Sequence, residues 1–388
     1  VLMEIQREGR QSLFVSAVAL GILALTTVVN AAEQAIHDHS AMDHSQMDHS
    51  KSAQAGQHVH HSHDKGSWMV EVELMRMDMD GLLRGSDSVS TRDISGAYPN
   101  PGTTPPNNIP IGNMGEYYLM SPTKMTMDMG MVMGMYGFTD KWTGMLMLNY
   151  LKNDMDMVMH MYMDQAGAMY MGDMTGSMKT SGIGDTEVGA MYTINKNWTA
   201  ALSLSIPTGS IDEKVDMTMC NAMGCVTNNG MPGSMQAPYA MQLGTGTYDF
   251  IPAITYKGYT DSWSWGGQAE WRIHTGTNDN EYTWGDRFEI DVWGKYAINK
   301  IWGIGARLDY LNADSISGKD PAINSMMAPT SDPANYGGTR TDLSLGITAA
   351  TGGNTFGLMY GVPIQQDVNG IQMEVQSIWS LTYQYMMM

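Results

Sequence analysis

The chain has 388 residues, of which only 16% are charged, while 43 are glycine and 40 are methionine. Its formal net charge of -19 excludes nucleic acid as a partner and favours cations, although acidic loops also keep a protein solvated. Tryptophan and tyrosine far outnumber phenylalanine, a mixture that is typical of short strands, tight turns and amphipathic rings at a membrane surface. We therefore expect one large barrel rather than two soluble domains.

Residues 1–31 are predicted to be an export signal. Arg7 and Arg10 precede an apolar run from Leu13 to Val29, and a small-residue cleavage site follows at Ala31. The alternative is a membrane anchor, but the run is short for a spanning helix and contains hydroxyl residues. Because no other stretch approaches the length of a spanning helix, further membrane insertion is expected to use strands.

Residues 32–66 are predicted to be a disordered metal-binding tail, because they contain almost no large apolar side chains. Eight of the ten histidines lie here, interleaved with methionine. Imidazole suits copper, zinc and nickel, and the soft thioether favours copper. The predicted ligands are His37, His39, Met42, His44, Met47, His49, His58, His60, His61 and His63. The alternative is a solvated polar tail with only opportunistic affinity for metals.

Aromatic residues flank a series of short polar turns in the remainder, residues 67–388. The spans Tyr136 to Trp142, Tyr192 to Trp198 and Tyr296 to Trp302 each enclose such a turn, and Tyr256 to Trp263 is one residue longer. A fifth turn, Thr351–Asn354, lacks the flanking pair. These features indicate hairpins with aromatic rings where strands leave a bilayer, and they predict short periplasmic turns.

Longer connections separate these hairpins at Gly81–Asn113, Ile206–Thr245 and Asn312–Thr339, and they are expected to be extracellular. With both chain ends in the periplasm, the pattern predicts an all-β, antiparallel, up-and-down transmembrane barrel of about twelve strands, in a range of about 10 to 14. The strands are expected to begin near Trp68, Met125, Trp142, Thr186, Trp198, Thr247, Trp263, Phe288, Trp302, Thr341, Phe356 and Ile371.

Strand parity distinguishes the lipid face from the lumen. Trp263, Trp265 and Trp271 share one face, opposite Glu270 and Arg272. A charge facing lipid at mid-membrane costs about 2–4 kcal/mol, so the charged face is assigned to the lumen. The same parity sends the alternating methionines inward as candidate metal ligands: Met75, Met77, Met79, Met125, Met127, Met129, Met131, Met133, Met135, Met145 and Met147. The alternative is flexible apolar filler on the lipid face, because a one-residue bulge would invert the assignment.

The two cysteines, Cys220 and Cys225, lie in a loop rich in glycine and asparagine. In an exported chain we expect a local disulfide between them. The alternative is metal ligation by this pair together with Met217, Met219 and Met223.

From about Trp68 onward the chain resembles the outer-membrane proteins named for the meta-pathway of phenol degradation (the MetA-pathway family), which are described as transporters. The matching pieces are Trp68–Met69, Met75–Gly81, Ser121–Met129, Gly182–Thr186, Pro207–Gly209, Leu243–Asp249 and Gly285–Asp286. The resemblance implies an outer-membrane barrel with a role in solute passage and carries over no catalytic residues. Separately, the Met-Asp-His-Ser repeats that begin at Met42 and Met47 are similar to tails of copper-resistance outer-membrane proteins.

We therefore expect an outer-membrane barrel of a Gram-negative bacterium that handles copper or silver ions. The tail would capture metal in the periplasm, where a metal-delivery protein is an expected partner, and thioethers would line the lumen. Copper is expected as ligand or substrate, with no obligatory cofactor, and outer-membrane lipid surrounds the barrel. The alternatives are a passive channel for small hydrophobic or aromatic solutes and a barrel that sequesters metal without transport. An enzyme is not expected, since only His160 and His274 lie outside the tail and no nucleophile–base motif occurs.

Overall fold

The computed structural model describes residues 61–94, 118–162, 170–222, 224–227 and 234–387. The predicted export signal and the tail up to His60 lie outside the described residues. No helix in the described part of the chain is long and apolar enough to cross a membrane.

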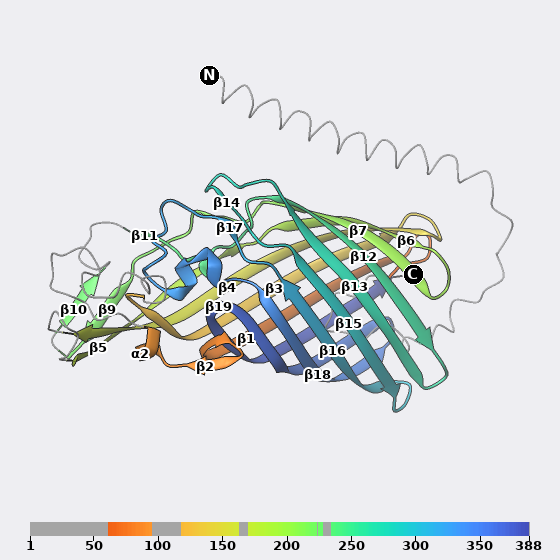
Figure 1. Cartoon of the computed structure of the whole chain (residues 1–388). Helices are drawn as coiled ribbons and strands as arrows, with labels where there is room; N and C mark the ends of the chain where they lie inside the picture. The colour runs from red at the N-terminus through yellow and green to blue at the C-terminus, as the bar shows by residue number, and fades with distance from the viewer. Residues whose placement is uncertain (1–60, 95–117, 163–169, 223, 228–233, 388) are drawn as a thin grey trace, which may run out of the picture. The chain divides into compact units, whose positions relative to one another are not determined.

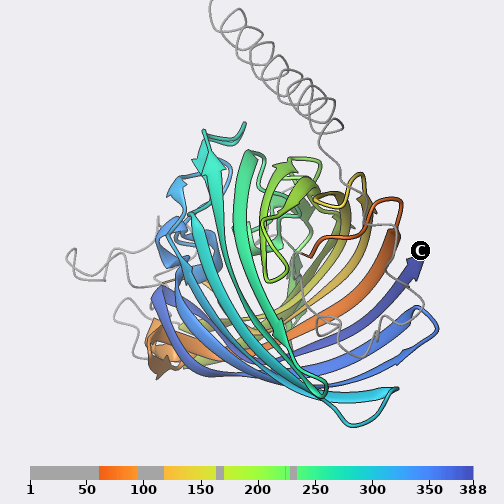
Figure 2. The ribbon, with the colours of Figure 1, turned by 90° about the vertical axis from the view of Figure 1, so that its right-hand side faces the viewer.

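Eleven antiparallel strands of the described chain close a ring (Figures 1 and 2). The first, β1, pairs with β3 on one side and with the last strand, β19, on the other. The ring closes because β6 pairs with both β4 and β7. Its members are β1 (Trp68–Gly85), β3 (Ser121–Gly137), β4 (Trp142–Tyr162), β6 (Thr186–Thr193), β7 (Trp198–Ile206), β12 (Tyr248–Tyr259), β13 (Trp263–Thr275), β15 (Arg287–Ala297), β16 (Trp302–Ala313), β18 (Gly338–Thr351) and β19 (Asn354–Met387).

The strand β19 contributes two neighbouring arms to this ring. Residues 354–368 pair with β18, and residues 371–387 pair with β1, both in antiparallel register. The chain reverses at Asn369-Gly370, where Gly370 has a φ of +61°, a conformation that glycine adopts without strain. The ring therefore contains twelve crossing segments, and the expected strand starts agree with the observed ones to within a few residues.

The predicted aromatic turns gather at one end of the barrel, here called the turn end. The turn between β3 and β4 is held by Phe138 N donating to Trp142 O at 2.9 Å, and the turn between β6 and β7 by the equivalent bond from Ile194 to Trp198 at 3.0 Å. Four tryptophans at this end contact the tyrosine of an adjacent strand, with their ring planes tilted. The ring centroids are 4.5 Å apart for Trp68–Tyr136, 4.9 Å for Trp142–Tyr192, 5.1 Å for Trp198–Tyr256 and 5.0 Å for Trp263–Tyr296.

The outer face of the ring is an apolar band. Large apolar side chains alternate along the strands with buried ones, so that Val132 is 49% exposed while its neighbour Met133 is 1% exposed. Exposed members of the band include Leu74, Leu146, Leu202, Ile254, Val292, Ile304, Leu345, Leu358 and Leu381. An apolar band bordered by paired aromatic rings is the exterior of a membrane barrel, so the assignment of charged faces to the lumen is correct.

Longer connections occupy the opposite end, here called the loop end. There β5 (Tyr170–Ile183) extends the pairing of β4 beyond β6. The other elements are β2 (Asp87–Val89), α2 (Thr91–Ile94), β8 (Lys214–Val215), β9 (Thr218–Asn221), β10 (Gly224–Thr227), β11 (Met235–Gln236), η6 (Tyr239–Met241), β14 (Tyr282–Thr283), β17 (Ser317–Gly318), η7 (Pro329–Ser331) and η8 (Pro333–Asn335). Cys220 and Cys225 form a disulfide across the β9–β10 hairpin.

Candidate functional site in the barrel lumen

The inward faces of β1, β3, β4 and β6 form a methionine wall. Met69 on β1 lies opposite Met135 on β3, which in turn lies opposite Met145 on β4. Residues paired in this way share a face, so the thioethers of successive strands lie side by side. The buried members are Met69, Met131, Met133, Met135, Met145, Met147 and Met191. The prediction that this run faces inward is correct, whereas its role as a set of metal ligands stays a prediction.

The methionine wall continues into a second cluster at the loop end. Met79, Met125, Met155 and Met157 are buried there, and Met77 and Met127 pack against them in part. Side chains from the loops complete this cluster, among them Met120, Met217, Met241 and Ala328. Met75 and Met129 are half-buried on the same inward face. Thioethers therefore line the described interior from the turn end to the loops.

The opposite side of the lumen is a charged wall on β13, β15, β16 and β18. Arg307 is ion-paired with both Asp291 and Asp309, and all three are largely buried. The Nε atom of Arg340 lies 2.9 Å from Asp342 Oδ2. These residues come from adjacent strands on which the charged residues share a face, so the charges neutralise one another along the wall.

A second ion-pair group reaches across the lumen. Arg272 on β13 contacts Glu187 on β6 at 3.2 Å and Asp249 on β12 at 3.6 Å. Asp249 is also within 3.7 Å of His274 Nε2. Since β6 and β13 are not neighbours in the ring, this contact joins separated strands.

An outer cavity of about 850 Å³ lies among the loops at the loop end. Its apolar lining combines the end of β4 and β5 with three loops, and it includes Met120, Met157, Met178, Val215, Met217, Met235, Ile323 and Met327. A few polar groups accompany them, including Gln236, whose Nε2 donates to Asp320 Oδ2 at 3.2 Å. This volume and this mixture of lining groups are typical of small-molecule sites.

Buried tyrosines hold the loops around the outer cavity. The Tyr118 hydroxyl donates to Asp332 at 3.1 Å and accepts from Asn335 Nδ2 at 2.7 Å. Burial raises the pKa of Tyr118 to about 12, so the hydroxyl stays protonated even at a pH where a free tyrosine ionises. The Tyr239 hydroxyl accepts from the backbone N of Asp320 at 2.9 Å.

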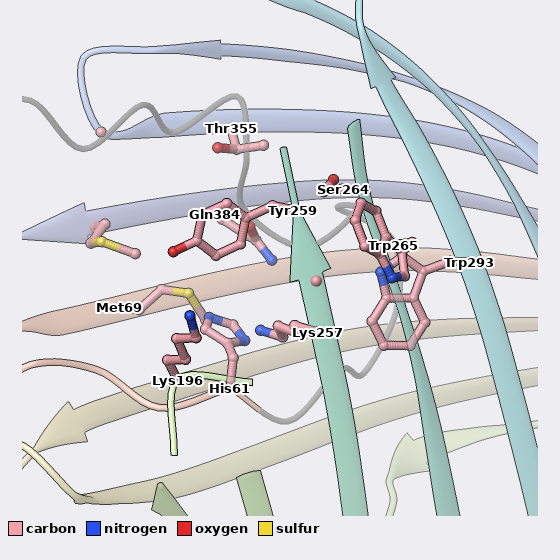
Figure 3. Close-up of a pocket in the computed structure, with 13 residues that line it drawn as sticks. His61, Met69, Lys196, Lys257, Tyr259, Ser264, Trp265, Trp293, Thr355 and Gln384 are labelled. Atoms are coloured by element: carbon pink, nitrogen blue, oxygen red, sulfur yellow. The ribbon is translucent and has the colours of Figure 1, made fainter. Parts of the chain in front are cut away.

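An inner cavity of about 180 Å³ lies at the turn end (Figure 3). His61 lines it together with Met69, Lys196 and Lys257, and Trp293, Gln384 and Met386 are further lining residues. Figure 3 shows the thioether of Met69 and the imidazole of His61 pointing toward each other, with a lysine on either side. The cavity thus combines side chains that can ligate a metal with two lysines.

Residues 61–66, which were expected to belong to the disordered tail, contact the barrel interior. The His63 backbone N donates to Thr143 Oγ1 at 2.8 Å, and Thr193 Oγ1 donates to Ser62 Oγ at 2.6 Å. Gly137 admits this segment, because a Cβ there would come within 2.1 Å of the carbonyl oxygen of Asp64. Burial, with a smaller contribution from nearby Lys257, lowers the pKa of His63 to about 4, so the side chain is neutral at neutral pH.

The structure brings together only some of the predicted metal ligands. His37, His39, Met42, His44, Met47, His49, His58 and His60 lie outside the described residues. Within the described ranges, no group of three or more His, Cys, Asp and Glu side chains is arranged to hold a metal ion. Sequence reasoning missed Lys257, although strand parity indicates it, since Tyr256 faces outward and its neighbour must face inward.

A closed antiparallel ring with an apolar exterior, aromatic girdle and polar lumen defines an outer-membrane β-barrel. No family model and no curated protein matches the sequence, so the resemblance to the phenol-degradation family stays a prediction. Among solved structures, the chain is similar to an outer membrane channel from Pseudomonas putida F1, with a TM-score of 0.51 and 14% identity over 84% of this chain and 97% of that one. The chain therefore has the fold of an outer-membrane channel.

Two further solved structures match the chain with lower scores. One is the Ralstonia pickettii toluene transporter TbuX, with a TM-score of 0.43 and 10% identity over 83% of this chain and 90% of that one. The other is a variant of the monoaromatic hydrocarbon channel TodX, with a TM-score of 0.46 and 10% identity over 84% and 91% of the two chains. Both TM-scores are below 0.5, so these two similarities carry no conclusion about this chain.

Proposed function

We propose that this chain is a passive outer-membrane channel for small apolar solutes, including aromatic hydrocarbons. The observation that carries the proposal is the outer cavity, which offers about 850 Å³ lined mainly by methionine and aliphatic side chains. The sequence predicts such a channel as the alternative to a copper or silver transporter. Within the described residues, no group of side chains gives comparable support to copper transport through the lumen.

The chemistry of the lining fits reversible capture of such solutes. Burial of each CH₂ group of a solute is worth about 0.8 kcal/mol, which is enough to concentrate a small apolar molecule without trapping it. Methionine is flexible and polarisable, so the cavity adapts to solutes of different shape. The methionine wall continues the same lining toward the turn end, which the short-turn rule assigns to the periplasm.

The experiment is the initial uptake rate of labelled toluene by Gram-negative cells with an intact lipopolysaccharide layer. The barrier must be this layer, because simple phospholipid vesicles admit apolar solutes unaided. Two lining residues, Met235 and Met327, are only partly buried, so their substitution spares the packed cluster. The double variant M235D/M327D is compared with M235L/M327L, which keeps size and removes only the thioether.

We expect the aspartate variant to lose the chain-dependent uptake by about tenfold or more, since desolvating a carboxylate costs well over the ~1.4 kcal/mol that a factor of ten represents. The leucine variant should retain it. Equal uptake by cells with and without the chain, or equal rates for both variants at matched outer-membrane levels, would refute the proposal. Uptake of arabinose serves as the measure of nonspecific leakage.

Capture of metal by the His/Met-rich tail stays a separate prediction. It concerns residues 37–60, which lie outside the described residues, and it does not depend on the nature of the transported solute. A variant lacking those residues should leave toluene uptake unchanged.

A further inference from the structure

We propose that His61, His63 and Met69 form a binding site for a soft monovalent metal ion, Cu(I) or Ag(I), at the inner cavity. This inference goes beyond the proposed solute channel and does not rest on it. It assigns a defined site to two residues of the histidine-rich tract and adds Met69, which the pattern of the sequence did not single out as a ligand.

The first observation is an imidazole nitrogen that lacks a partner. The side chain of His63 is 5% exposed, and its Nε2 atom has no hydrogen-bond partner among the described residues. A buried polar atom without a partner is unfavourable, so a ligand bound at His63 Nε2 would remove this cost. The backbone bond from His63 to Thr143 holds this side chain in place.

The second observation is the chemistry beside His63. The ring of His61 contacts that of His63 edge-on, with their centroids 4.7 Å apart. His61 and Met69 line the same cavity, and Met69 is 1% exposed. Two imidazoles and a thioether make a ligand set of the soft, uncharged type that Cu(I) accepts.

The third observation is the charge around the site. Lys196 and Lys257 line the cavity, and the described residues that line it include no carboxylate. Coulomb repulsion from the lysines is proportional to the charge of the bound ion, so it is twice as large for a divalent ion as for a monovalent one. A positive charge on these lysines therefore disfavours Zn(II) relative to Cu(I) or Ag(I).

The test is an anaerobic Cu(I) titration of the full chain, folded in detergent, against the chromogenic competitor bicinchoninate. The variant H61A/H63A is compared with H58A/H60A, which removes the same number of imidazoles from the same tract. We expect H61A/H63A to weaken the tightest Cu(I) site about 10- to 100-fold, while H58A/H60A leaves it unchanged. Identical affinities for the two double variants would overturn the proposal.

A second variant tests the site independently, in case the loss of His63 disturbs the structure of residues 61–66. Met69→Leu preserves size and apolar packing, and it should weaken Cu(I) binding and remove the sulfur contribution from the X-ray absorption spectrum of the bound metal. The heat-dependent migration of the barrel on electrophoresis checks that every variant is folded. A sulfur signal that persists in Met69→Leu would exclude Met69 as a ligand and overturn the site as proposed.

The effect of lysine charge on metal selectivity is measured by comparing the Zn(II) and Cu(I) affinities of Lys257→Gln with those of the unaltered chain. We expect this variant to raise the affinity for Zn(II) by a larger factor than the affinity for Cu(I). If the unaltered chain binds Zn(II) at this site as tightly as Cu(I), selection by charge is wrong. If sodium benzoate competes with Cu(I) in the unaltered chain but not in Lys257→Gln, the cavity is an anion pocket and the metal site is refuted.

Discussion

The two sides of the lumen are lined by side chains of opposite character, one mainly apolar and the other charged. On β1, β3 and β4 most of the inward side chains are thioethers that pack on one another, with the buried Glu71 and Glu73 among them on β1. On β15, β16 and β18 the inward side chains include arginine and aspartate in ion pairs. Both linings keep charge away from lipid, so contact with the membrane does not determine which of the two lines a given side of the lumen. The two walls differ in the interior of the barrel. The methionine wall is deformable and mainly apolar, whereas the charged wall is polar and its side chains are held in place by ion pairs.

The two walls are expected to respond differently to amino-acid substitutions. An ion pair depends on particular partners, because removing one leaves the other buried without compensation. A thioether surface depends on volume, because methionine fills irregular space and has no directional partner. The charged wall should therefore be intolerant of single substitutions that the methionine wall accepts.

The largest expected effect comes from breaking the charged wall with Arg307→Met. This removes the cation shared by Asp291 and Asp309 and leaves two carboxylates facing each other, at an expected cost of about 3–5 kcal/mol in the free energy of unfolding. Urea titration of the barrel refolded in lipid vesicles measures it. Arg340→Met is the matched control and should cost less, since among the described residues Arg340 is ion-paired with one carboxylate, that of Asp342. An equal or smaller cost for Arg307→Met would show that the wall does not depend on shared pairs.

An intermediate effect is expected from placing a charge on the other face of the methionine wall. Val132 points to lipid while its neighbour Met133 points inward. Val132→Arg should lower the free energy of unfolding by about 2–4 kcal/mol, the cost of an arginine at the bilayer midplane. Val132→Leu is the size control and should be close to neutral. If the arginine were tolerated at no cost, the assignment of faces on β3 would be inverted.

The smallest effect is expected within the methionine wall itself. Leucine has nearly the volume of methionine, so each of Met131→Leu, Met133→Leu and Met135→Leu should cost less than about 1.5 kcal/mol. Toluene uptake should stay near that of the unaltered chain, because the apolar lining remains. A large loss of uptake at preserved stability would mean that sulfur itself takes part in passage.

Much of the barrel was predictable because its rules are local. Alternation of exposed Leu146 and buried Met147 on β4 is visible in the sequence, and so are the Tyr-to-Trp spacings that mark the turns. The lipid face follows from a single cost, that of exposing charge to hydrocarbon. These features involve residues that are neighbours along one strand or across one hairpin.

The cavities were not predictable because they join residues that are distant in the chain. The outer cavity brings Met157 to Val215 and Met327, and no periodicity links a strand end with two separate loops. The entry of His63 into the barrel depends on the absence of a side chain at Gly137, more than 70 positions later. The sequence therefore predicts only that the tract binds metal, while the placement of His61 in one cavity with Met69 required the fold.

The pairing of β1 with β19 has a consequence for assembly. Every other neighbouring pair in the ring comes from successive ring strands, but Trp68 pairs with Met387. Such distant pairing carries a larger entropic cost of closure than a hairpin, so it forms slowly. The ring can therefore close only after its last hairpin has arrived, and the β1–β19 seam is where an incomplete or damaged chain would stay open.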